Sequence, residues 1–124
     1  MHSFSALCGR FLTVALLTAI TFAARDALEV QAASTSINIV EPTDNPDDYK
    51  FEHTSVTVTA GDTVTWVNQG LDTHSVTADG NIFDSKDIDA GKSWTYTFAT
   101  PGTFTYYCDP HPWMTGTVIV EPAA

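Results

Sequence analysis

The fold is decided near the C-terminus, where residues 103–121 read TFTYYCDPHPWMTGTVIVE. Side chains alternate across a β-strand, and the threonines, aromatics and valines on both sides of this stretch alternate with that period. The pattern predicts one strand over residues 103–108 and another over residues 115–121. A thiol, an imidazole and a thioether follow one another at intervals of three residues in the connection: Cys108, His111 and Met114.

The same alternation continues upstream of this stretch. It predicts further strands at residues 36–41, 55–59, 63–68, 74–78 and 92–99. Turn-forming residues occupy 60–62 and 100–102, and a polar connection at 42–52 contains Phe51 as a candidate core residue. Short strands separated by regular turns, with no long helical pattern, repeat or linker, indicate one all-β domain. We therefore expect an antiparallel Greek-key β-sandwich of about seven to eight strands.

The phase of the alternation places two reactive side chains at the rim of the core. Tyr106 and Cys108 share one face of their strand, and His74 shares a face with Val76. If the aromatic and aliphatic residues face the core, Cys108 and His74 face inward at strand ends. The loop that carries His111 would then fold over them.

Two imidazoles, one thiolate and one weak axial thioether are the ligands of a blue-copper electron-transfer site. Soft sulfur suits Cu(I), and imidazole suits both oxidation states of copper. The sequence therefore predicts that His74, Cys108, His111 and Met114 bind one copper ion. The alternative for Cys108 is a buried, inert thiol.

The cysteine count favours the metal. The chain contains two cysteines, Cys8 and Cys108, and residues 1–32 are predicted to be an export signal with an apolar run of 14 residues at 11–24. That run is short for a membrane span, which needs roughly 20 residues, although retention as a membrane anchor is the alternative. Cleavage after Ala32 would leave a single domain, residues 33–124, with a lone cysteine in a periplasmic or other extracytoplasmic compartment where cysteines usually pair.

The charge of the chain limits its partners. The formal net charge is −10, and residues 33–124 carry the same value, because they contain 3 lysines and 13 carboxylates. Binding to nucleic acid or insertion of this domain into an anionic membrane is not expected. A charge of this size can steer a cationic partner, or it can simply keep the protein, which we expect to be a monomer, in solution.

The pattern resembles a known family. The matching stretches are residues 60–68 (AGDTVTWVN), His74 and residues 106–118 (YYCDPHPWMTGTV). They are similar to the cupredoxins, the small type 1 blue copper proteins of the plastocyanin type, over roughly residues 36–121. The Cys-x-x-His-x-x-Met loop resembles that of amicyanin, the shortest type in the family. The resemblance implies His74, Cys108 and His111 as a trigonal plane around copper, with Met114 as the long axial contact.

The resemblance also implies what surrounds the ligands. It predicts that the backbone amide of Ser75 is the main donor to the Cys108 sulfur, since Pro110 has no N–H. Two residues depart from the family pattern: Ser75 stands where asparagine is common, and Asp109 stands where serine or threonine is common. These departures bear on the reduction potential and on the contacts around the ligands.

Three functions compete at this point. A soluble one-electron carrier, exchanging electrons with protein redox partners such as a c-type cytochrome or a dehydrogenase, needs only the four ligands. A copper-delivery protein would be expected to contain methionine-rich tracts, and Met114 is the only methionine in residues 33–124. A small copper oxidoreductase would need an open coordination position or a second copper site, and His53 is the only other histidine in that range. The electron carrier, which is not an enzyme, is therefore the favoured hypothesis.

Overall fold

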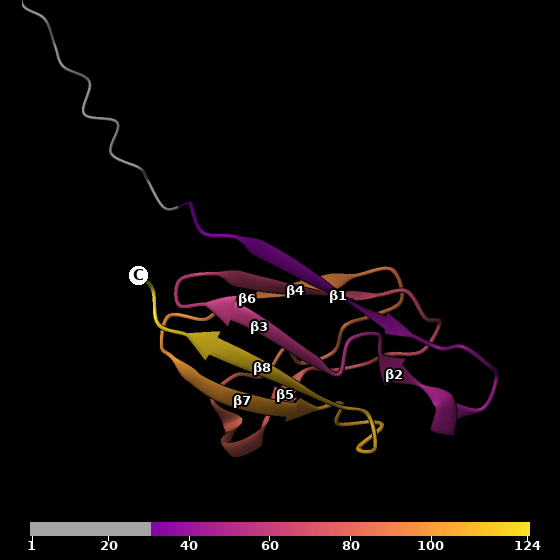
Figure 1. Ribbon diagram of the computed structural model, residues 1–124. Helices are drawn as coiled ribbons and strands as arrows, with labels where there is room; N and C mark the ends of the chain where they lie inside the picture. The colour runs from indigo at the N-terminus through magenta and orange to yellow at the C-terminus, as the bar shows by residue number, and fades with distance from the viewer. Residues whose placement is uncertain (1–30) are drawn as a thin grey trace, which may run out of the picture.

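The computed structural model describes residues 31–124, so most of the expected export signal lies outside the described residues. The described chain contains eight strands and two short 3-10 turns (Figure 1). The strands are β1 (Ser34–Val40), β2 (Lys50–Phe51), β3 (Ser55–Thr59), β4 (Thr63–Asn68), β5 (Thr77–Ala78), β6 (Ser93–Thr97), β7 (Gly102–Tyr107) and β8 (Thr115–Glu121), and the turns are η1 (Pro46–Asp48) and η2 (Asp79–Asn81). Among residues 31–124, no helix has the length and apolar character needed to cross a membrane.

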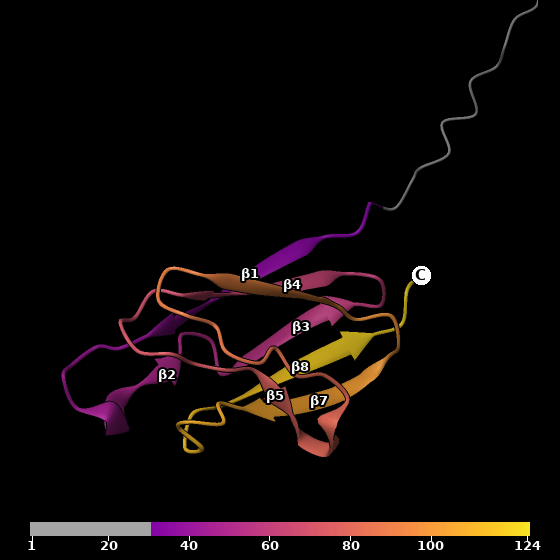
Figure 2. The ribbon, with the colours of Figure 1, turned by 180° about the vertical axis from the view of Figure 1, so that it is seen from behind.

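The strands form two four-stranded sheets that pack face to face. The strand order is β2-β1-β4-β6 in one sheet and β3-β8-β7-β5 in the other, and Figures 1 and 2 show the two layers from opposite sides. The predicted β-sandwich is confirmed. Its pairing is not purely antiparallel, because β1 pairs with β4 and β3 pairs with β8 in parallel. Parallel neighbours need a crossover connection, and the chain supplies it by passing through the opposite sheet between the paired strands.

The strands β3, β4 and β8 have the bounds that the alternation predicts. The pattern predicts no strand in residues 42–52, but β2 lies there and pairs with β1. A strand of two residues is too short for alternation to show. Phe51, the candidate core residue of that segment, is fully buried.

The expected strand at 74–78 is wrong in its first half, since only β5 is a strand there. His74 instead forms an isolated bridge with Ile88, in which the two amides donate to the opposite carbonyls at 3.2 and 2.8 Å. The amide of Val76 donates to the side chain of Ser85 at 2.8 Å. A side-chain acceptor takes the place of a backbone carbonyl here, so the ladder is interrupted.

The core is aromatic, and it orients the end of β7. Trp66 and Tyr106 are fully buried and contact each other edge to face with ring centroids 5.4 Å apart. Tyr106 pairs with Gly116 across β7 and β8, and a Cβ on Gly116 would overlap the Tyr106 ring. The tyrosine ring therefore lies over this glycine on the inner face. Cys108, two residues further along, has the same orientation and is fully buried.

Candidate metal centre

The loop between β7 and β8 consists of two consecutive tight turns. The amide of His111 donates to the carbonyl of Cys108 at 3.2 Å, and the amide of Met114 donates to the carbonyl of His111 at 2.9 Å. The amide of Cys108 donates to the carbonyl of Met114 at 3.0 Å and closes the loop. Each of these turns is closed by a hydrogen bond between residues three apart, and these bonded residues are Cys108, His111 and Met114. The loop lies at the opposite end of the sandwich from the C-terminus (Figure 1).

Three of the four predicted ligands offer donor atoms that face one another. The Cys108 Sγ lies 3.6 Å from His74 Nδ1 and 3.5 Å from His111 Nδ1, and the three donor atoms lie within 4.8 Å of one another. Imidazole and thiolate bonds to a metal of zinc size are about 2.0 and 2.3 Å long, which places donors around one ion about 3.5–4 Å apart. The three atoms are thus spaced to share one metal ion.

Burial differs among these side chains. Cys108 and His74 are fully buried, and His111 is partly exposed. The side chain of Met114, the fourth predicted ligand, is 1% exposed and belongs to the core beneath the loop. The arrangement places one edge of the site toward solvent, at His111.

The Cys108 sulfur has the amide donor that the resemblance implies. The Ser75 amide donates to Sγ at 3.3 Å, so that prediction is confirmed. Burial raises the pKa of the Cys108 thiol, although the hydrogen bonds from the Ser75 and His111 amides oppose this shift. The thiol of the metal-free protein is therefore protonated at neutral pH, and metal binding must release that proton.

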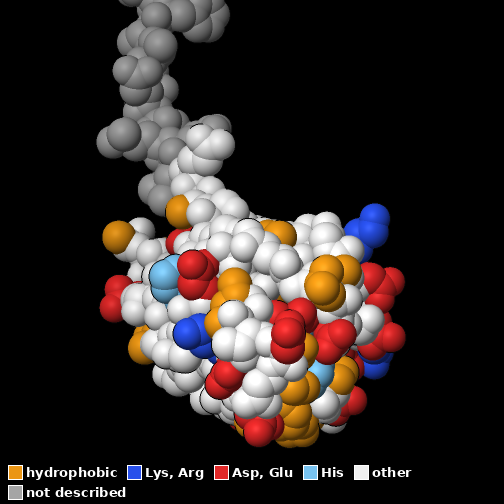
Figure 3. All heavy atoms as spheres, turned by 90° about the vertical axis from the view of Figure 1, so that its right-hand side faces the viewer, with side chains coloured by type: hydrophobic (Ala, Val, Ile, Leu, Met, Phe, Trp, Pro, Cys, Tyr) orange, Lys and Arg blue, Asp and Glu red, His pale blue; other side chains and the backbone are white. Residues whose placement is uncertain are grey.

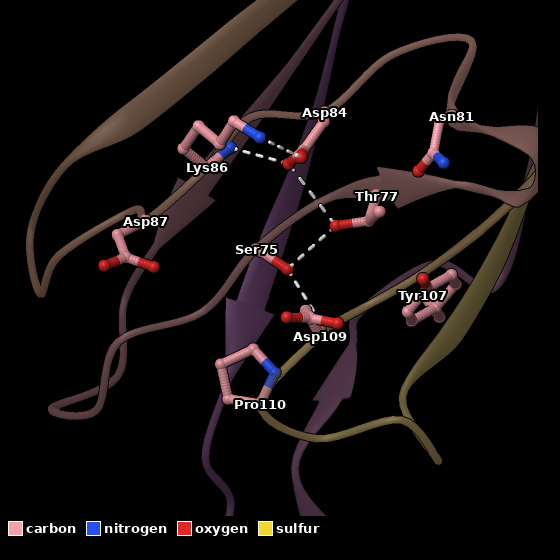
Figure 4. A pocket seen from close by; sticks show the side chains of 9 residues that line it. All are labelled: Ser75, Thr77, Asn81, Asp84, Lys86, Asp87, Tyr107, Asp109 and Pro110. Atoms are coloured by element: carbon pink, nitrogen blue, oxygen red, sulfur yellow. Dashed lines mark hydrogen bonds and ion pairs between the residues drawn. The ribbon is translucent and has the colours of Figure 1, made fainter.

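Ser75 also joins the two segments that carry the ligands. Its Oγ accepts a hydrogen bond from the Asp109 amide at 2.7 Å and lies 3.1 Å from Thr77 Oγ1. Figure 4 shows this contact at the edge of a polar hollow, where Asp84 and Lys86 form an ion pair of 2.7 Å. Serine thus makes the connection that asparagine was expected to make in the family pattern.

The far side of the His74 ring contacts a carboxylate that sequence reasoning missed. Glu41 Oε1 lies 2.9 Å from His74 Nε2. Partial burial raises the pKa of Glu41, but hydrogen bonds from the amides of Leu71 and Asp72 and from His74 outweigh it, so the pKa is lowered overall. No local pattern marks Glu41, because it lies 33 residues before His74.

Aromatic rings enclose His111 from two sides. Tyr49 and Trp113 each contact the His111 ring edge to face with centroids 5.4 Å apart, and Tyr49 also contacts His74 at 5.8 Å. Trp113 is 48% exposed, and its Nε1 donates to the carbonyl of Pro46 at 3.1 Å. Burial lowers the pKa of His111, and the nearby His74 acts in the same direction. Sequence reasoning also missed Tyr49, which lies just after η1.

The surface near His111 combines apolar and acidic side chains. Leu71 is 88% exposed and lines a surface hollow together with Tyr49, and Trp113, which contacts the His111 ring, is 48% exposed. Figure 3 views this end and shows hydrophobic side chains interspersed with many acidic groups and few basic ones.

The chain is similar to characterised copper proteins. Residues 38–121 match the family described as copper binding proteins, plastocyanin/azurin family. The chain is 33% identical over 98 residues to amicyanin-alpha from Methylorubrum extorquens, covering 75% of this chain and 76% of that protein. It is 31% identical over 139 residues to plastocyanin from Nostoc punctiforme, covering 98% of this chain and 99% of that one.

Solved structures agree with this similarity. A Cu(I) structure of an amicyanin variant superposes with a TM-score of 0.62 at 29% identity, covering 71% of this chain and 82% of that chain. A purple cupredoxin from Nitrosopumilus maritimus has the same TM-score and identity, covering 70% of this chain and 99% of that chain. The sandwich, the match over residues 38–121 and the facing sulfur and nitrogen donors agree with one another. The chain therefore belongs to the plastocyanin/azurin family of copper-binding proteins.

Proposed function

We propose that His74, Cys108, His111 and Met114 hold one copper ion and that the protein carries single electrons between redox proteins outside the cytoplasm. The observation that carries the proposal is the convergence of one thiol and two imidazole donors within 4.8 Å. Copper supplies a one-electron couple when bound to such a set. The extracytoplasmic location is supported by the apolar run at 11–24 and by the lone cysteine of residues 33–124.

The surroundings of the donors favour a carrier over an enzyme. Cys108 and His74 are fully buried. The lining of the polar hollow in Figure 4 includes Ser75 and Asp109 but none of the four ligands. A substrate in this hollow would not touch the donor atoms, whereas an electron needs only a short path through a side chain.

His111 is the proposed exit for the electron. Its ring is partly exposed between Tyr49 and Trp113, while His74 is enclosed. The exposed apolar side chains Leu71 and Trp113 would contact the partner directly, and the surrounding carboxylates would attract a basic rim. A basic c-type cytochrome or a dehydrogenase with a basic docking surface meets this description.

Copper titration of the purified protein tests the site. We expect one copper per chain and an intense visible band from Cys108 thiolate-to-Cu(II) charge transfer. Cys108→Ser should lose the band and keep the β-sheet circular dichroism, whereas His53→Gln, a change at an exposed histidine, should keep both. Stoichiometric copper binding by the unaltered protein without an intense band would contradict the proposed ligands.

Stopped-flow mixing tests the electron transfer. The reduced copper protein should reduce a basic c-type cytochrome, with a second-order rate that falls as salt rises. Transfer of the copper ion to a chelating acceptor, without electron transfer to any of several cytochromes, would favour the delivery role instead.

A further inference from the structure

We propose that Glu41 is the positioning residue of His74: its carboxylate selects the ring nitrogen that faces Cys108 and holds the segment that carries the ring, and Gly70 leaves the space it needs. The inference rests on the proposed function, because it assigns a role at the same copper site. Its decisive measurement is made on the metal-free protein, so it can fail without the proposed function failing.

The carboxylate of Glu41 accepts three hydrogen bonds from one short segment. Oε1 accepts from the Asp72 amide at 2.8 Å and from His74 Nε2 at 2.9 Å, and Oε2 accepts from the Leu71 amide at 2.8 Å. The His74 side chain is 0% exposed and that of Glu41 is 9% exposed. Charge-assisted hydrogen bonds of this length in a buried setting are stronger than neutral ones. Glu41 follows β1 directly, so a rigid sheet strand anchors the segment of His74.

The contact determines the tautomer of His74. An ionised carboxylate can only accept hydrogen bonds, and a neutral imidazole carries one hydrogen. In the neutral ring the hydrogen therefore lies on Nε2, next to Glu41. This leaves the lone pair on Nδ1, which lies 3.6 Å from the Cys108 Sγ. In the opposite tautomer, an N–H would point at the sulfur and the ring would have no donor for copper. Glu41 thus prepares the ring for the metal before the metal arrives.

The carboxylate also contributes charge. Its negative charge is hydrogen-bonded to a ligand ring in a partly buried position, where screening by solvent is weak. It favours the more positive oxidation state of the bound metal. We therefore expect Glu41 to lower the reduction potential of the site.

Gly70 is required for space rather than for backbone conformation. A Cβ at residue 70 would overlap the Cγ, Cδ and Oε1 atoms of Glu41, and Gly70 has no left-handed φ. Even alanine at this position would displace the carboxylate. Gly70, four residues before His74, therefore gives a second way to disturb the same contact without changing Glu41 itself.

The segment has enough other anchors to survive the loss of Glu41. The Asn68 side-chain amide donates to the carbonyls of Asp72 and Ile88 at 2.7 and 2.8 Å, and its oxygen accepts from the Gly70 amide at 2.9 Å. The His74–Ile88 bridge is made by backbone atoms. Changes at Glu41 should therefore free the ring without unfolding the sandwich.

The test compares Glu41→Ala, Glu41→Gln and Gly70→Ala with a charge control, Asp44→Asn. Asp44 is exposed and lines the same surface hollow as Glu41. Long-range ¹H–¹⁵N NMR of the metal-free proteins should show His74 with its hydrogen on Nε2 in the unaltered protein and in Asp44→Asn. Glu41→Ala and Gly70→Ala should show a mixture of tautomers. Glu41→Gln, whose amide oxygen still accepts, should keep the Nε2 hydrogen.

Metal affinity and potential complete the test. Competition with a chelator should show Zn²⁺ bound about 10–100-fold more weakly by Glu41→Ala and Gly70→Ala, and less than about 3-fold more weakly by Asp44→Asn. The potential of the copper protein should rise in Glu41→Gln by more than in Asp44→Asn. The proposal is overturned if Glu41→Ala and Gly70→Ala retain the tautomer and bind Zn²⁺ within about 3-fold of the unaltered protein. If Glu41→Ala does not fold, Gly70→Ala alone decides between these outcomes, because Glu41→Gln is expected to keep the tautomer.

Discussion

Replacing Ser75 by alanine should loosen the connection between the two segments that carry the ligands. The hydroxyl of Ser75 accepts a hydrogen bond from the Asp109 amide at 2.7 Å and lies 3.1 Å from Thr77 Oγ1. The substitution removes both contacts. It leaves the backbone donor to the Cys108 sulfur in place, because that bond comes from the Ser75 amide.

The expected loss follows from the number and burial of these contacts. Ser75 is 3% exposed, so water does not readily replace its hydroxyl. Each hydrogen bond contributes about 0.5–1.5 kcal/mol net. A polar group that is left buried without a hydrogen-bond partner adds a desolvation penalty. We expect the free energy of unfolding of the metal-free protein to fall by about 2 kcal/mol. With a urea m-value of about 2 kcal/mol/M for a domain of this size, the midpoint should fall by about 1 M.

Urea unfolding followed by tryptophan fluorescence measures this change. Ser93→Ala is the matched control, since Ser93 is an exposed serine on β6, where a substitution should change stability by less than about 0.5 kcal/mol. If Ser75→Ala shifts the midpoint no more than Ser93→Ala does, the hydroxyl does not hold the two segments together and the reasoning is refuted.

Three further predictions concern the potential and the acid stability. Met114→Gln should lower the reduction potential, because an oxygen donor favours Cu(II), and Met114→Leu should raise it; equal potentials in a redox titration would mean that the thioether does not reach the copper. Asp109→Asn should raise the potential, more at low salt than at high salt, since exposed charges are screened; a shift of opposite sign would show that Asp109 acts through the loop conformation. Hydrogen bonds from the Lys86 side chain and amide lower the pKa of Asp84. Asp84→Asn should therefore cost at most about 1 kcal/mol at neutral pH, and the gap in urea stability should close as pH falls below about 4; a gap that persists in acid would mean that the charge of Asp84 is not the cause.

The features that the sequence alone determined are those with a short range along the chain. Alternation over five to seven residues predicted β3, β4 and β8 with their observed bounds, because the two faces of a strand differ in burial. The ligand loop could also be predicted from the sequence, since Cys108, His111 and Met114 lie within a single pair of turns. Adjacent positions on one strand or turn have fixed relative directions, so their pattern is visible in the residues themselves.

The tertiary structure alone decided what meets this loop from elsewhere in the chain. Glu41 lies 33 residues before the His74 ring that it contacts, and Tyr49 reaches both histidines from the segment after η1. The parallel pairing of β1 with β4 likewise depends on how the two sheets connect. Such contacts depend on the packing of separate segments, so the local sequence does not predict them. A carboxylate at a strand end has the same neighbours in the sequence whether it faces solvent or a buried imidazole.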